Sequence, residues 1–275
     1  MPGLLAFHAH ADDETIAMGG TMAKYAARGI PIVVVTATDG ALGEVHNYDD
    51  PEPIRQRLAE VRAGEIRAAL DILGVKEHEF LGYRDSGMMG WETNYHPNCF
   101  WQADPNEAAS RLVRLIRRHQ PEVMTIYDPF GGYGHPDHIN THRVGLDAFY
   151  FADDLRRFPL TEGEEPWRVP RLYMNAWPRR RMAARADMML SQGTIDPETA
   201  KRMRHSGVPD DLVTVWEDIR DFIEVKLEAL KAHRTQIPPD WSMLAVPEED
   251  RPEVLGYEAF VGVFGAGSVG DGGLF

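Results

Sequence analysis

The sequence predicts an α/β fold built on a doubly wound, mainly parallel sheet, because short apolar runs alternate with segments of helical period. The apolar run at residues 3–9 and the Val- and Ile-rich run at residues 31–37 are typical of buried parallel strands. Between them, residues 15–28 have apolar side chains at helical spacing, and Gly29 follows as a helix-ending residue. This strand–helix–strand unit predicts a right-handed crossover between parallel strands.

The same alternation continues to about residue 150 and then weakens. In the first part we expect a helix over residues 53–73, a strand at 79–82, a helix over 105–119, a strand over 122–127 and a helix that begins near Pro136. In the second part we expect a polar connector over residues 153–170, a strand at 171–176, helices at 179–190 and 215–233, and a mobile Gly-rich tail. We therefore predict a Rossmann-like catalytic core at residues 1–150. Residues 151–275 form a less regular C-terminal portion of the same domain, with the elements that set substrate specificity.

Composition and charge exclude several classes of protein. A chain of 275 residues with 43% hydrophobic and 26% charged residues is ordinary for a globular protein. The net charge of −14 argues against a nucleic-acid partner, which needs clustered Lys and Arg. No apolar segment is long enough to span a membrane, and no basic region precedes the first apolar run, so we expect a cytoplasmic protein. Cys99 is the single cysteine, which excludes an intramolecular disulfide, and we interpret it as a half-buried loop thiol.

Two clusters of histidines and carboxylates follow two of the predicted strands. Residues 8–14 read His-Ala-His-Ala-Asp-Asp-Glu, and residues 135–138 read His-Pro-Asp-His. In an open parallel sheet, ligands bind beyond the carboxyl ends of the strands, where the strand order reverses. We therefore expect the two clusters to form one site at that position.

The residue types in these clusters are those of a catalytic zinc site. Two histidines and one carboxylate commonly hold zinc and leave a position open for water, and the ion lowers the pKa of that water and polarises a carbonyl. A further carboxylate is needed as a base, and the Asp12–Asp13 pair supplies both roles, while His135 can donate to a developing oxyanion. An acidic first helical turn explains the first cluster alone, and a Pro-Asp turn explains the second alone. Together at two strand ends, they favour metal-assisted amide hydrolysis.

These motifs resemble the LmbE/PIG-L-like family of zinc-dependent N-deacetylases. Residues 9–14 match the family's Ala-His-Pro-Asp-Asp-Glu signature, except that Ala11 stands in place of its proline, and residues 135–138 match its His-Pro-Asp-His signature. Within the family, the similarity is strongest to the deacetylases and amidases of the mycothiol pathway. Further matching segments are Arg62 with residues 64–65, and residues 84–87, 127–129, 131–134 and 233–236.

The resemblance implies a role for each site residue. It implies that His10, Asp13 and His138 bind one Zn²⁺ per chain, with other divalent ions possible, and that Asp12 is the general base. His135 would stabilise the oxyanion and is a candidate for protonating the leaving amine, with Asp137 orienting its ring and Tyr133 beside the substrate carbonyl. Arg62 and Asp85 would hold sugar hydroxyls or the inositol side. Glu14 either supports the ligands or is only a helix-start acid, and His8 is interpreted as a satisfied buried histidine.

We therefore predict zinc-dependent hydrolysis of an N-acyl group, preferably N-acetyl, on a small amino-sugar-like substrate. Three alternatives stay open: an amidase for a larger thiol S-conjugate, a deacetylase of a specialised metabolite, and a non-catalytic sugar-binding protein, which would not need Asp12. The aromatic- and Met-rich loop at residues 83–104 either forms a substrate wall or anchors itself on the domain. The sequence also leaves a homo-oligomer open.

Overall fold

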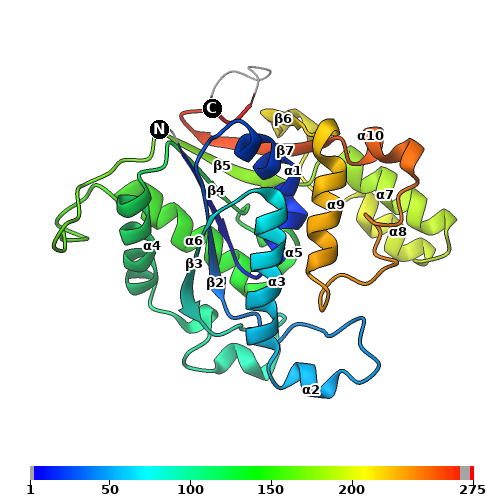
Figure 1. Ribbon diagram of the computed structural model, residues 1–275, viewed down its shortest axis with the longest axis horizontal. Helices are drawn as coiled ribbons and strands as arrows, with labels where there is room; N and C mark the ends of the chain where they lie inside the picture. Colours follow the sequence, from blue (N-terminus) through cyan, green and yellow to red (C-terminus); the bar gives the residue numbers. More distant parts are fainter. Residues whose placement is uncertain (1–2, 267–272) are drawn as a thin grey trace.

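A computed structural model describes residues 3–266 and 273–275 (Figure 1). Seven strands form one sheet in the order β3-β2-β1-β4-β5-β7-β6. The first five in chain order pair in parallel: β1 (Leu4–His8), β2 (Ile32–Thr38), β3 (Glu77–Tyr83), β4 (Val123–Ile126) and β5 (Arg171–Ala176). Two antiparallel strands, β7 (Tyr257–Phe264) and β6 (Val215–Asp218), complete the sheet beyond β5. The predicted doubly wound, mainly parallel sheet is confirmed.

Helices cover both faces of this sheet (Figure 1). One face packs against α1 (Asp13–Ala27), α3 (Leu58–Leu73) and α9 (Ile223–Ala232), and the other against α4 (Pro105–His119) and α6 (Pro136–Phe151). Side chains of a strand alternate between the two faces. In β1, Leu4 and Ala6 therefore belong to one apolar core, and Leu5 and Phe7 belong to the other. A strand buried on both faces needs the continuous apolar run that the sequence has here.

Short helices connect these elements. Within the described residues they are α2 (Glu52–Arg55), η1 (Glu92–Tyr95), η2 (Phe100–Gln102), α5 (Gly131–Gly134), η3 (Asp210–Leu212), η4 (Arg220–Phe222), η5 (Glu248–Asp250) and α10 (Arg251–Val254). Two longer helices, α7 (Arg179–Ser191) and α8 (Pro197–Arg204), pack against each other at the right of Figure 1, away from the sheet. They extend the molecule on the side where α9 and α10 lie.

Several predictions for the C-terminal portion are wrong. The helix expected over residues 215–233 begins only at Ile223, because residues 215–218 pair with β7 as a strand. That partner strand, β7, lies in a segment where no strand was expected. Part of the tail expected to be mobile, residues 267–272, lies outside the described residues, but Leu274 is fully buried against α1. Outside the C-terminal portion, the prediction for Cys99 is also wrong, because this residue is fully buried and not half-buried.

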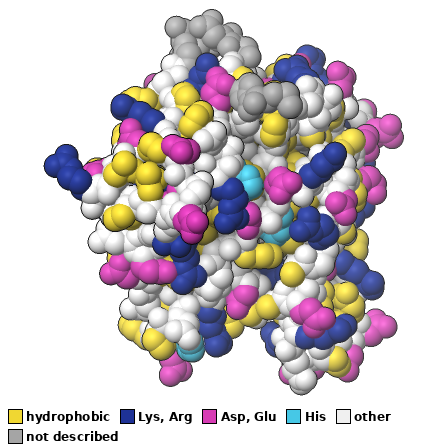
Figure 2. Space-filling model, turned by 60° about the vertical axis from the view of Figure 1, so that its left-hand side comes forward, with side chains coloured by type: hydrophobic (Ala, Val, Ile, Leu, Met, Phe, Trp, Pro, Cys, Tyr) yellow, Lys and Arg dark blue, Asp and Glu magenta, His cyan; other side chains and the backbone are white. Residues whose placement is uncertain are grey.

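Figure 2 shows acidic and basic side chains interspersed over one face, with no continuous basic patch on it. Among the helices of residues 3–266 and 273–275, none combines the length and the apolar character needed to cross a bilayer.

The strand order reverses between β1 and β4, which determines where a ligand can bind. From β1 the chain passes through α1 to β2 on one side, while β4 lies on the other side of β1 and leads into α6 on the opposite face. The carboxyl ends of β1 and β4 therefore open into a crevice between two diverging helices. The first histidine cluster follows the end of β1, and the second follows the end of β4.

Candidate metal centre

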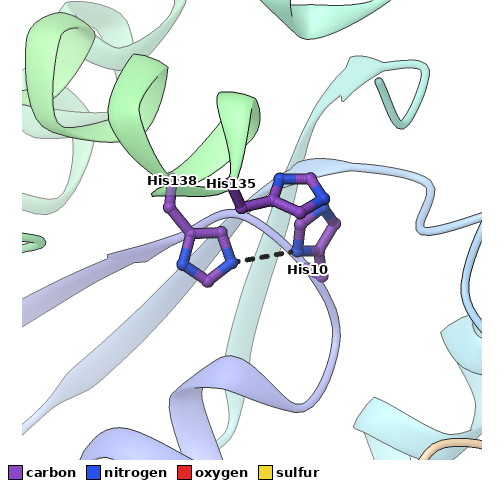
Figure 3. A group of neighbouring side chains, drawn as sticks. All are labelled: His10, His135 and His138. Atoms are coloured by element: carbon purple, nitrogen blue, oxygen red, sulfur yellow. Dashed lines mark hydrogen bonds between the residues drawn. The ribbon is translucent and has the colours of Figure 1, made fainter. Parts of the chain in front are cut away.

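The sequence places two histidine-bearing segments on either side of this crevice. His10 lies in the turn between β1 and α1, and His135 and His138 lie at the start of α6 (Figure 3). Helix α6 begins there because Pro136 is suited to the first helical position and the ring of His135 caps it by accepting the Asp137 N–H at 3.1 Å. Residues three apart lie on one side at the start of a helix, so His135 and His138 both face His10.

Three donor atoms form a nearly equilateral triangle. Nδ1 of His10, Oδ2 of Asp13 and Nε2 of His138 are each 3.3 Å from the other two. Zinc lies about 2.0–2.1 Å from N and O ligands in tetrahedral sites, and the edge of such a tetrahedron is about 3.3–3.4 Å. The three atoms thus have the chemistry and the spacing of three tetrahedral ligands, with a fourth position free for water or substrate.

Other combinations of these side chains also bring donor atoms together. His10, His135 and His138 form one such group, and His10, Asp85, His135 and Asp137 form another, with donor atoms within 4.8 Å of one another. We favour the set that contains Asp13, because its three edges match a single tetrahedron and because Nδ1 of His135 already accepts a backbone hydrogen bond.

Carboxylates surround the ring of His10. Its Nε2 is 3.2 Å from Asp137 and 3.7 Å from Asp85, the arrangement that commonly orients a metal-binding histidine. Burial lowers the pKa of His10, but Asp85, Asp13 and Asp137 together raise it well above its usual value. Burial raises the pKa of Asp13, and His138 and His10 outweigh this and hold it well below its usual value. The site therefore favours positive charge between these groups.

Asp12 lies beside the triangle in an unusual backbone conformation. Its φ is 130°, a region that non-glycine residues rarely adopt, and it is held there by Glu14, whose carboxylate accepts the Asp12 N–H at 2.9 Å. Glu14 in turn lies 3.0 Å from Nε2 of the fully buried His233. Burial raises the pKa of Asp12 to about 6, although Arg62, 3.4 Å from its carboxylate, lowers it. With this pKa, the carboxylate of Asp12 is suited to accept a proton near neutral pH.

His135 is neutral and has a defined tautomer. Burial, with the nearby rings of His10 and His138, lowers the pKa of His135 to about 3. Because its Nδ1 accepts the Asp137 N–H, the ring proton lies on Nε2, which can donate a hydrogen bond. The ring of Tyr133 lies 5.0 Å from that of His138, with its side chain 59% exposed at the crevice.

The Asp137 carboxylate has a different contact from the one expected. It accepts hydrogen bonds from the backbone N–H and the hydroxyl of Ser86 and lies against His10. Its backbone N–H, not its carboxylate, contacts the ring of His135. The start of α6 thus fixes His135, while the Asp137 side chain fixes His10.

Arg62 and Asp85, expected to bind sugar, both line the crevice and already have protein partners. Arg62 donates to the backbone carbonyls of Gly40 and Ala11, and its buried Nε has no partner among the described residues. Asp85 accepts from the backbone N–H groups of Leu42 and Gly87. Both side chains are thereby rigidly held at the edge of the metal centre.

Some functional contacts were not expected from the sequence. The ring of Tyr127 stacks on His138, 4.4 Å away, and its hydroxyl lies 3.3 Å from Nδ1 of His8. Nε2 of His8 has no partner in the described part of the chain, so only one of its nitrogens is satisfied, and burial lowers the pKa of His8 to about 4. The Glu14–His233 pair was also missed, since 219 positions separate the two residues. Only the resemblance of residues 127–129 and 233–236 to the family pointed to these segments.

The metal centre is one end of a cleft of about 1060 Å³. The loop at residues 83–104 contributes Asp85, Gly87, Met88 and Trp91 to its wall, whereas Tyr95 and Trp101 do not line it. The cleft continues into the C-terminal portion, where it is lined by Trp177, Met182, Arg185, Arg202, Met203 and Trp241. Residues from both portions of the chain thus form one cleft.

Fold and site together define an α/β protein whose cleft brings together histidines and carboxylates that could hold a metal ion. Solved structures share this fold. N,N'-diacetylchitobiose deacetylase from Pyrococcus horikoshii matches with a TM-score of 0.67 at 23% identity, over 96% of this chain and 84% of that one. GalB, the 4-carboxy-2-hydroxymuconate hydratase from Pseudomonas putida KT2440, matches with a TM-score of 0.64 at 21% identity, over 98% of each chain. At such identities the likeness establishes the fold alone.

Sequence comparison is more specific. Residues 5–149 match the family described as PIG-L: GlcNAc-PI de-N-acetylase. Two relatives, from Thermomonospora curvata and Thermobifida fusca, are each 44% identical to this chain. The matches cover 85% and 94% of this chain and 80% and 91% of the relatives, respectively. Both relatives are named 1D-myo-inositol 2-acetamido-2-deoxy-alpha-D-glucopyranoside deacetylase. The chain belongs to the PIG-L de-N-acetylase family.

Proposed function

We propose that this protein is a zinc-dependent deacetylase that hydrolyses the N-acetyl group of an N-acetylglucosaminyl-inositol. The observation that carries the proposal is the 3.3 Å triangle of donor atoms from His10, Asp13 and His138, with Asp12 next to it. Two relatives at 44% identity, both named as deacetylases of this amino-sugar-inositol, support the choice of substrate.

In this mechanism His10, Asp13 and His138 hold the ion. A bound zinc ion lowers the pKa of a water molecule to about 7 and polarises the acyl carbonyl. Asp12 accepts a proton from the attacking water, for which a pKa of about 6 is suitable. The base is oriented by Glu14, which fixes its backbone, and by Arg62, which lies against its carboxylate.

The remaining residues bind and stabilise the reacting group. The Nε2–H of His135 donates to the oxyanion that develops on the acyl oxygen, and Tyr133 flanks the same position. When the C–N bond breaks, the leaving amine needs a proton. A neutral His135 with a pKa of about 3 is a poor acid, so we assign the return of that proton to Asp12. Arg62 and Asp85 line the cleft where the sugar hydroxyls would lie.

A second candidate is amidase action on a larger conjugate of the same amino sugar. One observation favours it: the cleft of about 1060 Å³ extends well past the metal centre to Trp177 and Trp241, and pockets for drug-sized ligands span about 300–1000 Å³. Both reactions break the same kind of C–N bond with the same residues. In either case we assign catalysis to residues 1–150 and substrate selection to residues 151–275.

The decisive experiment measures acetate release from N-acetylglucosaminyl-inositol by metal-stripped protein, before and after zinc is restored. We expect release only with zinc. Protein that contains one equivalent of zinc and releases no acetate would contradict the deacetylase proposal and leave the larger conjugate as the substrate to test.

Replacing Asp12 separates the base from the metal ligands. We expect Asp12→Asn to retain zinc and to lose about 10²–10⁴-fold in kcat, because an amide cannot accept the proton. Elemental analysis and acetate release measure the two effects. A rate within a few fold of the wild-type rate would exclude Asp12 as the base.

Replacing His138 tests the ligand set. We expect His138→Ala to lose zinc on dialysis, because only two of the three donor atoms remain. His205→Ala is the control, since His205 is exposed on the surface just after α8 and should leave the zinc content unchanged. Full zinc occupancy in His138→Ala would mean that another group, such as His135, is the third ligand.

A further inference from the structure

Helix α9 packs against α1 and α3, on the face of the sheet that α1 covers (Figure 1). Two polar side chains, Lys226 within α9 and His233 at its C-terminal end, are buried in these contacts. They are seven positions apart, so they lie about two helical turns from each other on one side of α9. Buried polar groups are unfavourable unless they are hydrogen-bonded, and both side chains have a partner in the first half of α1.

Glu14 connects His233 to Asp12, the proposed base. Nε2 of His233 lies 3.0 Å from Oε1 of Glu14, and Oε2 of Glu14 accepts the Asp12 N–H at 2.9 Å. The Thr15 hydroxyl also donates to Oε1, at 2.6 Å. Glu14 and His233 are both fully buried, so water does not compete for these contacts. The contact with His233 on one side therefore fixes the orientation in which the other carboxylate oxygen meets the Asp12 N–H.

The backbone of Asp12 needs such a support. Its φ of 130° is a conformation that non-glycine residues rarely adopt and keep only where surrounding groups impose it. A hydrogen bond from a backbone N–H to a carboxylate is charge-assisted and stronger than one to a neutral acceptor. The hydrogen bond from Asp12 to Glu14 is therefore suited to hold this conformation, and His233 is the group that holds Glu14.

The first turn of α1 is separated from the rest of its helix by a break. In an unbroken helix the Gly20 N–H would bond to the Ile16 carbonyl. Here Gly20 donates to Glu258 on β7 at 3.0 Å, and the Ile16 carbonyl accepts from Lys226 at 2.9 Å. Lys226 and Glu258 form an ion pair at 2.6 Å, and Met18, between Ile16 and Gly20, has a non-helical φ of −147°. Side chains from outside α1 therefore orient its first turn.

His233 is itself held in place from α3. Directly after it, the N–H and the hydroxyl of Thr235 donate to the carboxylate of Glu65 on α3, at 2.7 and 2.6 Å. The carbonyl of His233 accepts the N–H groups of Gln236 and Ile237 at 3.0 and 2.9 Å. The turn after α9 is thus fixed by its own backbone and by α3, so the ring of His233 is a rigid support for Glu14.

We propose that His233 is a positioning residue, which acts through Glu14 to hold Asp12 in the backbone conformation that the base needs. His233 touches neither the substrate nor the metal ligands in this role. It links the C-terminal portion of the chain to the catalytic turn after β1. The inference rests on the proposed function only in taking Asp12 as the base.

Nuclear magnetic resonance of the purified protein tests this without turnover. We expect the amide proton of Asp12 to be shifted downfield and to exchange slowly with solvent, as an N–H bonded to a buried carboxylate does. In His233→Ala we expect this amide to exchange about tenfold or more faster, because Glu14 loses its second contact. An Asp12 amide that is unchanged in both shift and exchange rate would overturn the inference.

A pair of polar variants tests the same contact without leaving a large cavity that could impair folding. The amide of glutamine reaches the position of Nε2 and can donate to Glu14. The amide of asparagine reaches only the position of Nδ1, which has no partner among the described residues. We expect His233→Gln to keep the Asp12 amide signal of the wild type and His233→Asn to lose it. Equal signals in these two variants would contradict the role of the contact with Glu14.

Kinetics separate positioning from stability, with acetate release from N-acetylglucosaminyl-inositol as the assay. At full zinc content we expect His233→Asn to lower kcat about tenfold or more and to change KM less than about twofold, because the base is displaced and substrate binding is not. Leu230→Ala is the control, since Leu230 is equally buried on α9 but belongs to an apolar cluster. It should lower Tm and keep kcat.

Equal losses of kcat in His233→Asn and Leu230→Ala would overturn the positioning role, because a general loss of stability would then explain both. A wild-type protein that releases no acetate would count against the deacetylase proposal. The Asp12 amide signals would still decide the role of His233.

Discussion

At the scale of residues, the catalytic centre depends on one strained turn. Asp12 has a φ of 130°, and the usual family proline before it is Ala11. The backbone is held instead by side chains, because Arg62 binds the carbonyl of Ala11 and Glu14 binds the N–H of Asp12. Strain of about 1–3 kcal/mol persists only where the surroundings impose it. These two contacts restrain the turn that carries Asp12, the proposed base, without a proline at position 11.

A glycine next to the metal centre should be equally important. The φ of Gly131 is +66°, and a Cβ there would lie 2.5 Å from Cβ of His138 and 2.7 Å from the backbone N of Ile139. Gly131→Ala must therefore displace the first turn of α6, and we expect at least a tenfold loss of zinc affinity in a competition titration with a chelator. Gly132→Ala is the matched control, since its φ is +75° but no atom lies within 4 Å. Equal losses in both variants would show that backbone strain, not the contact with His138, matters.

At the scale of elements, strands could be recognised where local pattern and tertiary role agree. The apolar run of β2 is buried at every position, and no other structure suits it. Residues 215–222 are different, because their apolar residues fit a helical stripe as well as a strand. Residues 215–218 become β6 because they pair with β7, and the short helix η4 follows them. Short apolar segments are ambiguous until a partner is present.

The pairing of β2 with β3 predicts a dependence of stability on pH. Burial lowers the pKa of His78 on β3 to about 4, and its Nε2 lies 3.0 Å from the hydroxyl of Thr36 on β2. Between pH 6.5 and 4 the unfolded chain binds a proton at His78 that the folded chain does not, so the free energy of unfolding falls as the pH falls through this window. The contribution is on the order of 1–3 kcal/mol.

Urea denaturation of the metal-free wild type and of His78→Gln, each at pH 7 and pH 4.5, measures the contribution of His78 to the free energy of unfolding. We expect the wild type to lose more of its free energy of unfolding than the variant, because glutamine does not titrate. Parallel losses in the two proteins would remove His78 as the cause.

At the scale of the whole molecule, the C-terminal residues close the core. Leu274 is fully buried, and its N–H donates to the hydroxyl of Tyr25 at 2.9 Å and to Glu217 at 3.0 Å. We expect Leu274→Ala to lower the free energy of unfolding by about 2–4 kcal/mol, the usual effect of truncating a buried leucine. Leu160→Ala is the control, since that side chain is 39% exposed. Equal denaturation midpoints for the two variants would show that the chain end contributes little to stability.

The sequence by itself determined the parallel half of the sheet, the position of the two histidine clusters at strand ends, and the residue types that meet there. These follow from periodicity and local order, which each segment carries alone. Only the tertiary structure decided that β6 and β7 extend the sheet, that His233 contacts Glu14, and that residues of α7 and α8 line the same cleft as the two histidine clusters. These features depend on contacts between residues far apart in the chain. Such contacts leave no periodic signal, because their partners are chosen by packing and charge once the core has formed.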